Sequence, residues 1–336
     1  MKVLVTGGAG YIGSHTTLRL IERGHEVVVV DDLSNSSQVA LERVGELTGT
    51  AVHLRVGDVR DADLLDEVMT QFRPDAVIHF AGLKSVGESV LEPLRYWDVN
   101  VGSTVALMSA MERHGVRRMV FSSSATVYGS AAEVPYVETA EVGRDIANPY
   151  GQTKFVIERM MQDAAASPTA WELVSLRYFN PIGAHPSGRI GEDPRNIPNN
   201  LAPYITQVLS GRLERLSVFG DDYDTPDGTG VRDYIHVMDL ADGHLAALEK
   251  CRPGFDAINL GTGRGTSVLE LVSHFEAAAG RPVARVVTER RPGDLAAYWA
   301  DATKAAEVLD WRATRSVEEA CADSWRWQEQ NPNGFA

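Results

Sequence analysis

The chain opens with Val3-Leu4-Val5-Thr6-Gly7-Gly8-Ala9-Gly10-Tyr11-Ile12-Gly13, an apolar run followed by a glycine-rich turn. The apolar run predicts a buried strand, and the pattern over Tyr11–Arg23, which ends at Gly24, predicts a helix. Glycines at positions 7, 10 and 13 let the backbone approach a pyrophosphate, whose charge the helix N-terminus stabilises. This stretch therefore predicts the first strand–helix unit of a dinucleotide-binding fold, and a generic tight turn is the alternative.

Further strands and helices alternate after this unit. The short aliphatic runs that predict strands are Val3–Thr6, Glu26–Val30, Val52–Val56, Ala76–Phe80, Met119–Ser122 and Leu173–Arg177. Nearly continuous aliphatic character is typical of strands that are buried on both faces of a parallel sheet. We therefore expect an α/β fold with a doubly wound, Rossmann-like parallel sheet and ligands at the carboxyl ends of its strands.

The amino-acid composition of the chain changes after about residue 180, where Pro, Gly and Asn become frequent. A helix is expected over Ser267–Ala279, because Ser267 and Glu270 can form a capping box and Gly280 supplies a stop. We expect an NAD-binding domain over residues 1–180 and a smaller, discontinuous C-terminal α/β lobe for substrate over residues 181–336. A segment at about 232–262 could rejoin the first domain.

Several residues at the predicted strand ends suit a nicotinamide dinucleotide. Asp31 ends the second strand, where an acid accepts hydrogen bonds from a ribose diol and repels a 2′-phosphate, which favours NAD over NADP. Asp58 and Val59 follow the third strand, and Phe80–Lys84 follows the fourth. Lys84 could reach cofactor hydroxyls, or it could be a solvated loop lysine.

Tyr150 and Lys154 are the candidate catalytic pair. If Asn148–Lys154 is helical, positions i and i+4 share a face, and the ammonium lies beside the phenol. A cationic neighbour favours the phenolate and so lowers a pKa that is ordinarily about 10. Ser124, at the end of the fifth predicted strand, could bridge a substrate hydroxyl to Tyr150, or it could cap local backbone. A tyrosine and a lysine can occur at this spacing by chance, so the pair indicates a catalytic role only in combination with the dinucleotide turn.

Composition narrows the classes of partner and compartment. The chain has 336 residues, of which 44% are apolar and 23% charged, and a formal net charge of −14. This charge argues against nonspecific binding to nucleic acid or to an anionic membrane. Cys251 and Cys321 are too few for a disulfide framework, and neither a signal peptide nor a membrane span is apparent. We therefore expect a cytoplasmic protein. We expect no metal site, because His79, His185 and His236 lack the spacing of metal ligands.

Longer motifs resemble those of a known family. Gly7–His15, His79–Lys84, Ser122–Gly129 and Asn148–Lys154 resemble the extended short-chain dehydrogenase/reductases. Leu176–Gly188 and Gly230–Ala241 resemble the UDP-glucose 4-epimerases within that group, and the resemblance extends to about residue 330. One departure is Asp32, where members of the family often have Asn; this second acid further disfavours NADP.

The resemblance implies a role for each matching residue. NAD would contact Gly7, Gly10, Tyr11, Ile12, Gly13, Asp31, Asp32, Asn35, Ser36, Asp58, Val59, Phe80, Ala81, Gly82, Leu83, Lys84, Asn100, Tyr150, Lys154 and Phe179. The UDP-sugar would contact Lys84, Ser124, Tyr150, Asn180, Asn200, Leu201, Ser217, Phe219, Arg232, Tyr234, Arg291, Asp294 and Tyr298. Arginines suit a diphosphate, although a single arginine is more often a solvated surface residue.

The resemblance also implies the reaction, an interconversion of UDP-galactose and UDP-glucose through a 4-keto sugar, as in galactose metabolism. A nucleotide-sugar 4,6-dehydratase is an alternative, but such enzymes carry Asp-Glu after the threonine, where this chain has Val127-Tyr128. An NAD-sensing regulator is a second alternative, although such proteins tend to lose the tyrosine–lysine pair. The resemblance further implies that apolar positions on Val99–Met111 (Val101, Val105, Met108) and Phe155–Met161 form a homodimer contact of four helices; burial of these positions against the sheet alone is the alternative.

Overall fold

The computed structural model describes residues 1–130, 132–195, 197–291 and 293–335. A parallel sheet of seven strands forms its centre, in the order β11-β6-β5-β4-β1-β2-β3. The strands are β1 (Lys2–Thr6), β2 (Glu26–Asp31), β3 (His53–Val56), β4 (Ala76–His79), β5 (Arg118–Ser122), β6 (Glu172–Tyr178) and β11 (Gly254–Leu260). The predicted fold class and the six predicted strands are confirmed, with ends that differ by a residue or so.

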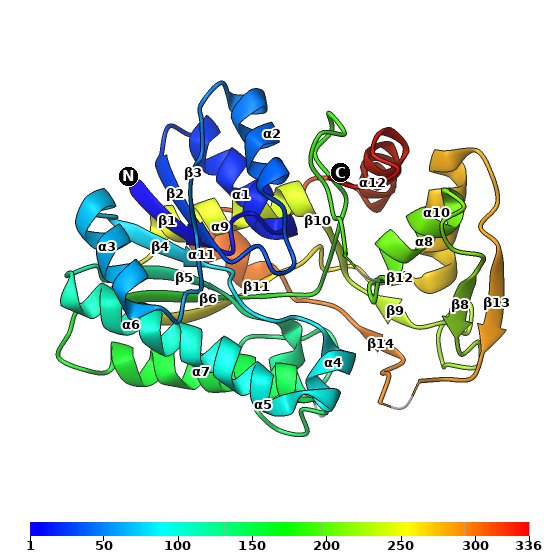
Figure 1. Ribbon diagram of the computed structural model, residues 1–336. Helices are drawn as coiled ribbons and strands as arrows, with labels where there is room; N and C mark the ends of the chain where they lie inside the picture. The colour runs from blue at the N-terminus through cyan, green and yellow to red at the C-terminus, as the bar shows by residue number, and fades with distance from the viewer. Residues whose placement is uncertain (131, 196, 292, 336) are drawn as a thin grey trace.

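Helices cover both faces of this sheet (Figure 1). One face carries α1 (Tyr11–Glu22), α2 (Gln38–Thr48), α9 (Val237–Lys250) and α11 (Thr303–Leu309), and the other carries α3 (Ala62–Phe72), α6 (Gly102–Arg113) and α7 (Pro149–Ala165). Successive side chains of a strand point to opposite faces. Val3 and Val5 accordingly belong to the core on the α1 face of the sheet, whereas Leu4 belongs to the core on the α3 face. The continuous aliphatic runs of the sequence reflect this two-sided burial.

Short helical segments follow β4 and β5. They are α4 (Val86–Leu91), α5 (Pro93–Tyr96), a π-helical turn over Trp97–Val101 and a 3₁₀ turn over Ala125–Tyr128. The expected helix over Val99–Met111 therefore begins later, because its first residues belong to the π-helical turn. Val105 is exposed on α6, whereas Met108 is buried in the core beneath the sheet.

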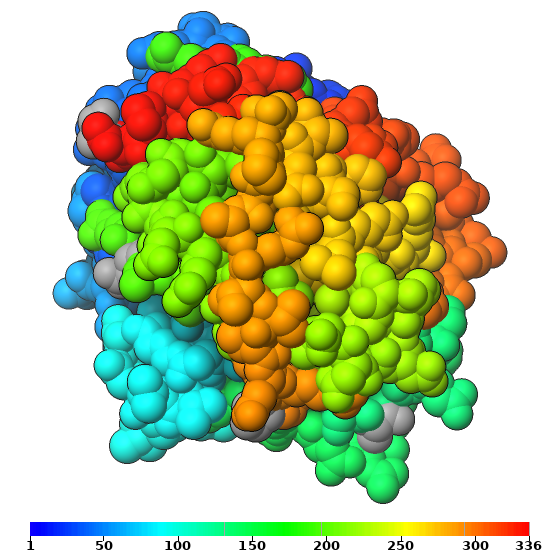
Figure 2. Space-filling model, turned by 90° about the vertical axis from the view of Figure 1, so that its right-hand side faces the viewer, coloured from blue at the N-terminus to red at the C-terminus, as the bar shows by residue number. Residues whose placement is uncertain are grey.

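A separate, smaller core lies beyond the carboxyl ends of the strands of the large sheet. It packs α8 (Leu201–Leu209), α10 (Val268–Ala279) and α12 (Val317–Gln330) with the strand pair β8 (Leu216–Phe219) and β13 (Arg285–Thr288). The capping box of Ser267 and Glu270 and the left-handed Gly280 bound α10 as expected. In Figure 2, which faces this part of the molecule, the orange segment that contains β13 runs down the middle.

Five short strands connect the large sheet to the smaller core. β7 (Asn180–Ile182) pairs with β10 (Tyr234–His236), and β9 (Val231–Arg232) pairs with both β12 (Thr266–Ser267) and β14 (Ala297–Tyr298). After β10 the chain returns to the large sheet through α9 and β11. The strand β14 therefore lies between the sheet and the smaller core (Figure 1). Within the described residues, no helix is both long and apolar enough to cross a membrane.

Candidate active site

The glycine-rich turn joins β1 to α1 with very little space around its backbone. Gly7 has a φ of +71°, and a Cβ atom there would lie 2.6 Å from the backbone nitrogen of Ala81. A Cβ atom on Gly13 would lie 2.2 Å from the carbonyl oxygen of Gly7. Gly10 precedes the helix without any side-chain cap, so the first amides of α1, those of Tyr11 and Ile12, project at the sheet edge. This geometry suits a pyrophosphate.

Asp31 ends β2 beside this turn and is 6% exposed. Its carboxylate accepts hydrogen bonds from the backbone amides of Ala9 at 2.9 Å and Leu33 at 3.0 Å, and from the hydroxyl of Ser36 at 2.7 Å. A carboxylate has room for about four donors, so a ribose hydroxyl can still be accommodated. Asp32 is exposed and caps the backbone of Ser34 at 2.8 Å. Asp31 therefore faces the turn, whereas Asp32 points outward.

The segments after β3 and β4 complete this edge. Asp58 is paired with Arg60, whose hydrogen bonds lower the pKa of the carboxyl group, and Val59 is buried under the sheet. Asn100 is 2% exposed and binds both the amide and the carbonyl of Leu83, at 2.7 and 3.0 Å. The Asn100 amide also donates to Thr153 on α7 at 3.0 Å. Asn100 thus fixes the loop after β4 against the first turns of α7.

The catalytic pair lies where α7 passes the carboxyl end of β5. Asn148 caps α7 through the amide of Gly151 at 2.9 Å, and Pro149 occupies the first helical position. Tyr150 therefore lies in the first turn, and Lys154 follows one turn later. The Lys154 ammonium lies 5.8 Å from the centroid of the Tyr150 ring and donates to the carbonyl of Ser122 at 2.7 Å. The predicted i, i+4 neighbourhood is present.

Burial dominates the acid–base properties of this pair. It raises the pKa of Tyr150, and hydrogen bonding to Ser124 opposes that rise. It lowers the pKa of Lys154 to about 7, against an opposing effect of Glu158. The i, i+4 spacing predicted a phenol made more acidic by its cationic neighbour. In this structure the ammonium donates its hydrogen bond to Ser122 rather than to the phenol, and desolvation is the largest effect on the pKa of Tyr150.

Ser124 caps local backbone and also lies beside Tyr150. Its hydroxyl oxygen accepts from the amide and the hydroxyl of Thr126, at 3.2 and 3.0 Å, and so caps the 3₁₀ turn. The same hydroxyl is the hydrogen-bonding neighbour of Tyr150. Val127 and Tyr128, which follow Thr126, are buried, so apolar packing occupies the positions where a dehydratase would carry its acids.

Aromatic rings from distant parts of the chain gather around Tyr298. The rings of Tyr298 and Phe179 have centroids 6.0 Å apart, and the Arg232 guanidinium lies 4.5 Å from the centroid of Tyr298. Tyr298 also stacks on Tyr136, with centroids 6.1 Å apart and an interplanar angle of 7°. The structure thus brings three predicted site residues together, Tyr298, Phe179 and Arg232, and adds a third aromatic ring, that of Tyr136, which was not predicted.

The strands β7 and β10 position two more predicted contacts. Asn180 pairs with Tyr234 in parallel register, and the Asn180 side chain donates to the carbonyl of Asp233 at 3.2 Å. Tyr234 is 4% exposed and packs in the smaller core. Asp233 is fully buried and accepts hydrogen bonds from Thr262, Gly263 and Ala300. It therefore ties the strand of Arg232 to that of Tyr298.

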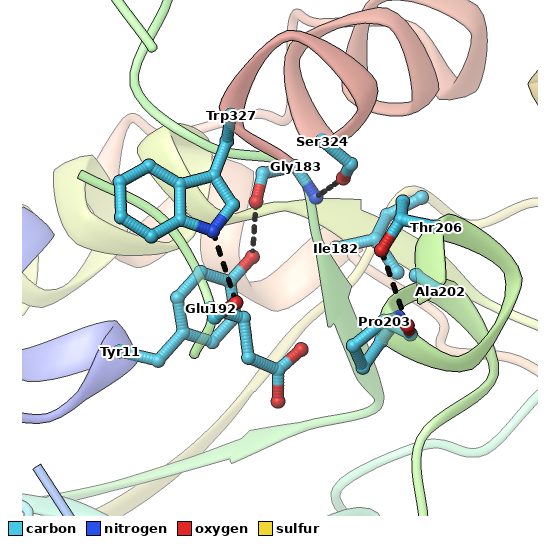
Figure 3. Close-up of a pocket in the computed structure, with 9 residues that line it drawn as sticks. All are labelled: Tyr11, Ile182, Gly183, Glu192, Ala202, Pro203, Thr206, Ser324 and Trp327. Atoms are coloured by element: carbon cyan, nitrogen blue, oxygen red, sulfur yellow. Dashed lines mark hydrogen bonds between the residues drawn. The ribbon is translucent and has the colours of Figure 1, made fainter. Parts of the chain in front are cut away.

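A polar cluster joins Lys84 to the segment before α8. The Lys84 ammonium and the Asn200 amide both contact one oxygen of Glu192, at 3.1 and 3.0 Å. Leu201 follows Asn200 and packs against the smaller core. Behind this cluster is a cavity of about 10 Å³, lined by Tyr11, Glu192, Thr206 and Trp327 among others (Figure 3). It has room for about one water molecule. It belongs to the packing between α1, α8 and α12 and is too small for a nucleotide.

The remaining predicted contacts lie on the strand pair β8–β13 and the segment after it. Ser217 and Phe219 are on β8, and Phe219 is 39% exposed. The Arg291 guanidinium lies 4.7 Å from the centroid of the Phe219 ring and is paired with Asp294 at 2.9 Å. An exposed aromatic face with an arginine beside it offers both a stacking surface and a cation to a ligand.

Most of the predicted residues therefore lie in three groups: the dinucleotide turn, the catalytic pair, and the β8–β13 face with the aromatic residues and arginines near it. Tyr136, Glu192 and Asp233 were missed. Asp233 lies inside the motif Gly230–Ala241 and could have been found as an acid beside Arg232. Tyr136 and Glu192 lie in loops without a periodic signal, so sequence patterns offered nothing to identify them. Asn35 is exposed near the turn and makes no contact that distinguishes it.

The chain is similar over its whole length to characterised proteins. Residues 3–261 match the NAD dependent epimerase/dehydratase family, and the chain belongs to that family. It is 56% identical to a UDP-glucose 4-epimerase of Bacillus subtilis and 54% identical to one of Yersinia pestis, covering 100% of this chain and 99% of each relative. A crystal structure of UDP-glucose 4-epimerase from Bifidobacterium longum, in complex with NAD+ and UDP, superposes with a TM-score of 0.96 at 50% identity, covering 100% of both chains.

Proposed function

We propose that this protein interconverts UDP-galactose and UDP-glucose by inverting C4 of the hexose with a retained NAD. The observation that carries the proposal is the position of Tyr150, Ser124 and Lys154 at the sheet edge that also holds the glycine-rich turn. Relatives more than 50% identical over their full length carry the name of this activity. A phenol beside a dinucleotide site can exchange a proton with a sugar hydroxyl at the carbon from which hydride leaves.

Each catalytic residue then has a chemical task. Tyr150 takes the proton of the 4-hydroxyl, and Ser124 holds that hydroxyl and the phenol in line. Lys154 provides the positive charge that stabilises the phenolate. NAD, when bound, accepts the C4 hydride and returns it, and its cationic ring adds to the charge that favours phenolate. Between the two transfers the 4-keto sugar turns about its diphosphate linkage and presents its opposite face. Tyr150 then returns the proton.

The other predicted residues bind the two ligands. The amides of Tyr11 and Ile12 hold the pyrophosphate, Asp31 holds a ribose diol, and the segments at Asp58–Val59 and Phe80–Lys84 line the sheet edge. Arg232 and Arg291 bind the diphosphate of the substrate, and Phe219 stacks on its base. Asn180, Asn200, Leu201, Ser217, Tyr234 and Asp294 complete the substrate site. Since no net oxidation occurs, the cofactor stays bound through many turnovers.

The proposed function assigns one ligand to each part of the chain. We assign NAD binding to residues 1–180 with the returning segment at about 232–262, and substrate binding to the remainder of 181–336. A second copy of the chain is the partner that we assign to the exposed positions of α6 and α7, of which Val105 is 46% exposed. We place the enzyme in galactose metabolism in the cytoplasm, where its two buried free cysteines would stay reduced.

A coupled assay tests the proposal. Purified protein is given UDP-galactose, and UDP-glucose is detected by a UDP-glucose dehydrogenase added in excess. Because that dehydrogenase itself consumes NAD, the protein is first incubated with UDP-galactose alone and the coupling enzyme and NAD are added afterwards; UDP-glucose formed in the first step supports the assignment. Net reduction of free NAD in the absence of the coupling enzyme would instead indicate a dehydrogenase, and release of water with a 4-keto-6-deoxy product would indicate a dehydratase.

A further inference from the structure

Glu158 lies one helical turn beyond Lys154 on α7, and its side chain is 1% exposed. It forms an ion pair with Arg177 on β6, whose side chain is 3% exposed, at 2.6 Å. Its carboxylate also accepts hydrogen bonds from the hydroxyls of Ser123 at 2.6 Å and Ser175 at 2.8 Å. Three side chains, two from β6 and one from the residue after β5, therefore hold one buried carboxylate, and this extensive pairing offsets the cost of its desolvation.

This pair touches both parts of the catalytic machinery. Ser123 precedes Ser124, so its bond to Glu158 fixes the end of β5 that carries the substrate-facing hydroxyl. Positions i and i+4 of a helix lie on one face, so Lys154 and Glu158 share one face of α7; the ion pair of Glu158 is with Arg177, and its carboxylate acts on the Lys154 ammonium through space. Arg177 extends the network to the hydroxyl of Tyr128 at 3.1 Å, and Tyr128 donates to Asn259 on β11 at 2.7 Å.

We propose that Glu158, clamped by Arg177, is a positioning residue that keeps the Lys154 ammonium charged beside Tyr150 and holds Ser124 in register. The inference rests on the proposed function for its catalytic meaning. Its physical basis is electrostatic: burial disfavours the ammonium, and a fixed carboxylate one turn away opposes that effect. In accord with this, Glu158 raises the pKa of Lys154 against the larger effect of burial.

The other groups that face Lys154 do not substitute for Glu158. From β5 come the ring of Phe121, whose centroid lies 4.7 Å from the ammonium, and the carbonyl of Ser122. From β4 comes His79, whose two nitrogens contact Thr6 and Thr104 and whose pKa is lowered to about 3, so it is neutral at ordinary pH. From β6, Tyr178 lies near Tyr150 with a pKa raised by burial, and is likewise neutral.

The charges around Arg177 complete this account. Glu138 faces Arg177 and Tyr128 from the loop before α7, and burial raises its pKa. Within the described part of the chain, Glu158 is the carboxylate that acts on the pKa of Lys154. Removing its charge should therefore lower that pKa, and no neighbouring acid is placed to restore it.

The test compares Glu158→Gln with Glu158→Asp in the NAD-loaded protein. The chain has five lysines, so heteronuclear NMR of the lysine side chains can follow Lys154 directly, with Lys154→Met for assignment. We expect Glu158→Gln to lower the pKa of Lys154 by about one unit, and Glu158→Asp to keep it near the wild-type value. The limb of the pH–kcat profile that follows Lys154 should move to lower pH by the same amount, with little change in KM.

Asp239→Asn is the matched control. Asp239 is another buried carboxylate bound by an arginine and by backbone amides, but its partners, Arg315 and Thr314, lie behind α9. Asp239→Asn should lower stability without moving the Lys154 titration. If Glu158→Gln does not fold, Glu158→Gln combined with Arg177→Met removes the pair without leaving an unpaired charge. It should shift Lys154 in the same direction.

Two results would overturn the inference. One is a Lys154 titration that is identical in the wild type and in a folded Glu158 variant. The other is a loss of turnover by the same factor at every pH, which is what a purely structural role predicts. The NMR titration needs no turnover, so an inactive wild-type protein would refute the proposed function and still leave the Glu158 inference open to a decisive result.

Discussion

The Lys154 ammonium donates a hydrogen bond to the carbonyl of Ser122, 2.7 Å away, and lies 5.8 Å from the centroid of the Tyr150 ring. Lys154 therefore acts on the phenol through space. Its own charge depends on pH, because burial lowers its pKa to about 7. The ammonium is charged below that pH and loses its proton as the pH rises through it.

Replacing Lys154 with Met should reduce turnover and move the acid limb of the pH–rate profile to higher pH. The physical reason is that the phenolate loses a cationic neighbour, which raises the pKa of Tyr150, a pKa that burial has already raised. Initial rates measured across the pH range check this prediction. A profile of unchanged shape would remove Lys154 from the electrostatics of the base.

Replacing Tyr150 with Phe should preserve the fold and NAD binding but lower kcat by about 10²- to 10⁴-fold, the usual contribution of a general acid–base group. The ring keeps its contact with Lys154, so the variant removes the hydroxyl alone. Circular dichroism and bound-NAD content serve as controls. Near-normal epimerisation by the folded variant would refute the mechanism.

The large sheet could be predicted from sequence because each strand is a short aliphatic run that is buried on both faces. The dinucleotide turn could be predicted because Gly7 and Gly13 lie where any side chain would collide with backbone. Both signals are local. They do not depend on which distant segment packs against them.

The aromatic group could be predicted less well. Tyr298, Phe179 and Arg232 were named through the resemblance, but their mutual contacts join β14, the end of β6 and β9, which are far apart in the chain. Tyr136 lies in a loop whose backbone bonds to Trp299 at 2.9 Å and thereby reaches Tyr298. No periodic pattern encodes such a contact. The effect of burial on Tyr150 was missed for the same reason, because desolvation depends on the whole assembled site.

Replacing Asp31 with Ala should weaken retention of NAD and ease the entry of NADP. The carboxylate organises the turn through the amide of Ala9 and the hydroxyl of Ser36, and it would repel a 2′-phosphate. Loss of hydrogen bonds to a charged group corresponds to roughly a tenfold or greater loss in affinity. Dialysis followed by quantification of bound cofactor measures the retention. Asp32→Ala is the matched control: because Asp32 points outward, it should change retention less.

Replacing Tyr298 with Cys should admit UDP-N-acetylglucosamine, which we expect to be a poor substrate of the native protein. The Tyr298 ring stacks on Tyr136, at an interplanar angle of 7°, and also contacts the guanidinium of Arg232, 4.5 Å from its centroid. A ring fixed in this way cannot turn aside for an acetamido group, and steric overlap excludes a substrate more sharply than a lost contact does.

Kinetics on both sugars measure the effect of Tyr298. The variant should gain about tenfold or more in kcat/KM for the acetylated sugar, which corresponds to about 1.4 kcal/mol, while it keeps activity on UDP-galactose. Tyr298→Phe is the control, because it retains the ring and should retain the exclusion. Comparable rates on the two sugars with the native protein would show that Tyr298 does not limit the size of the sugar, and that its stacking on Tyr136 serves the packing between β14 and the loop before α7.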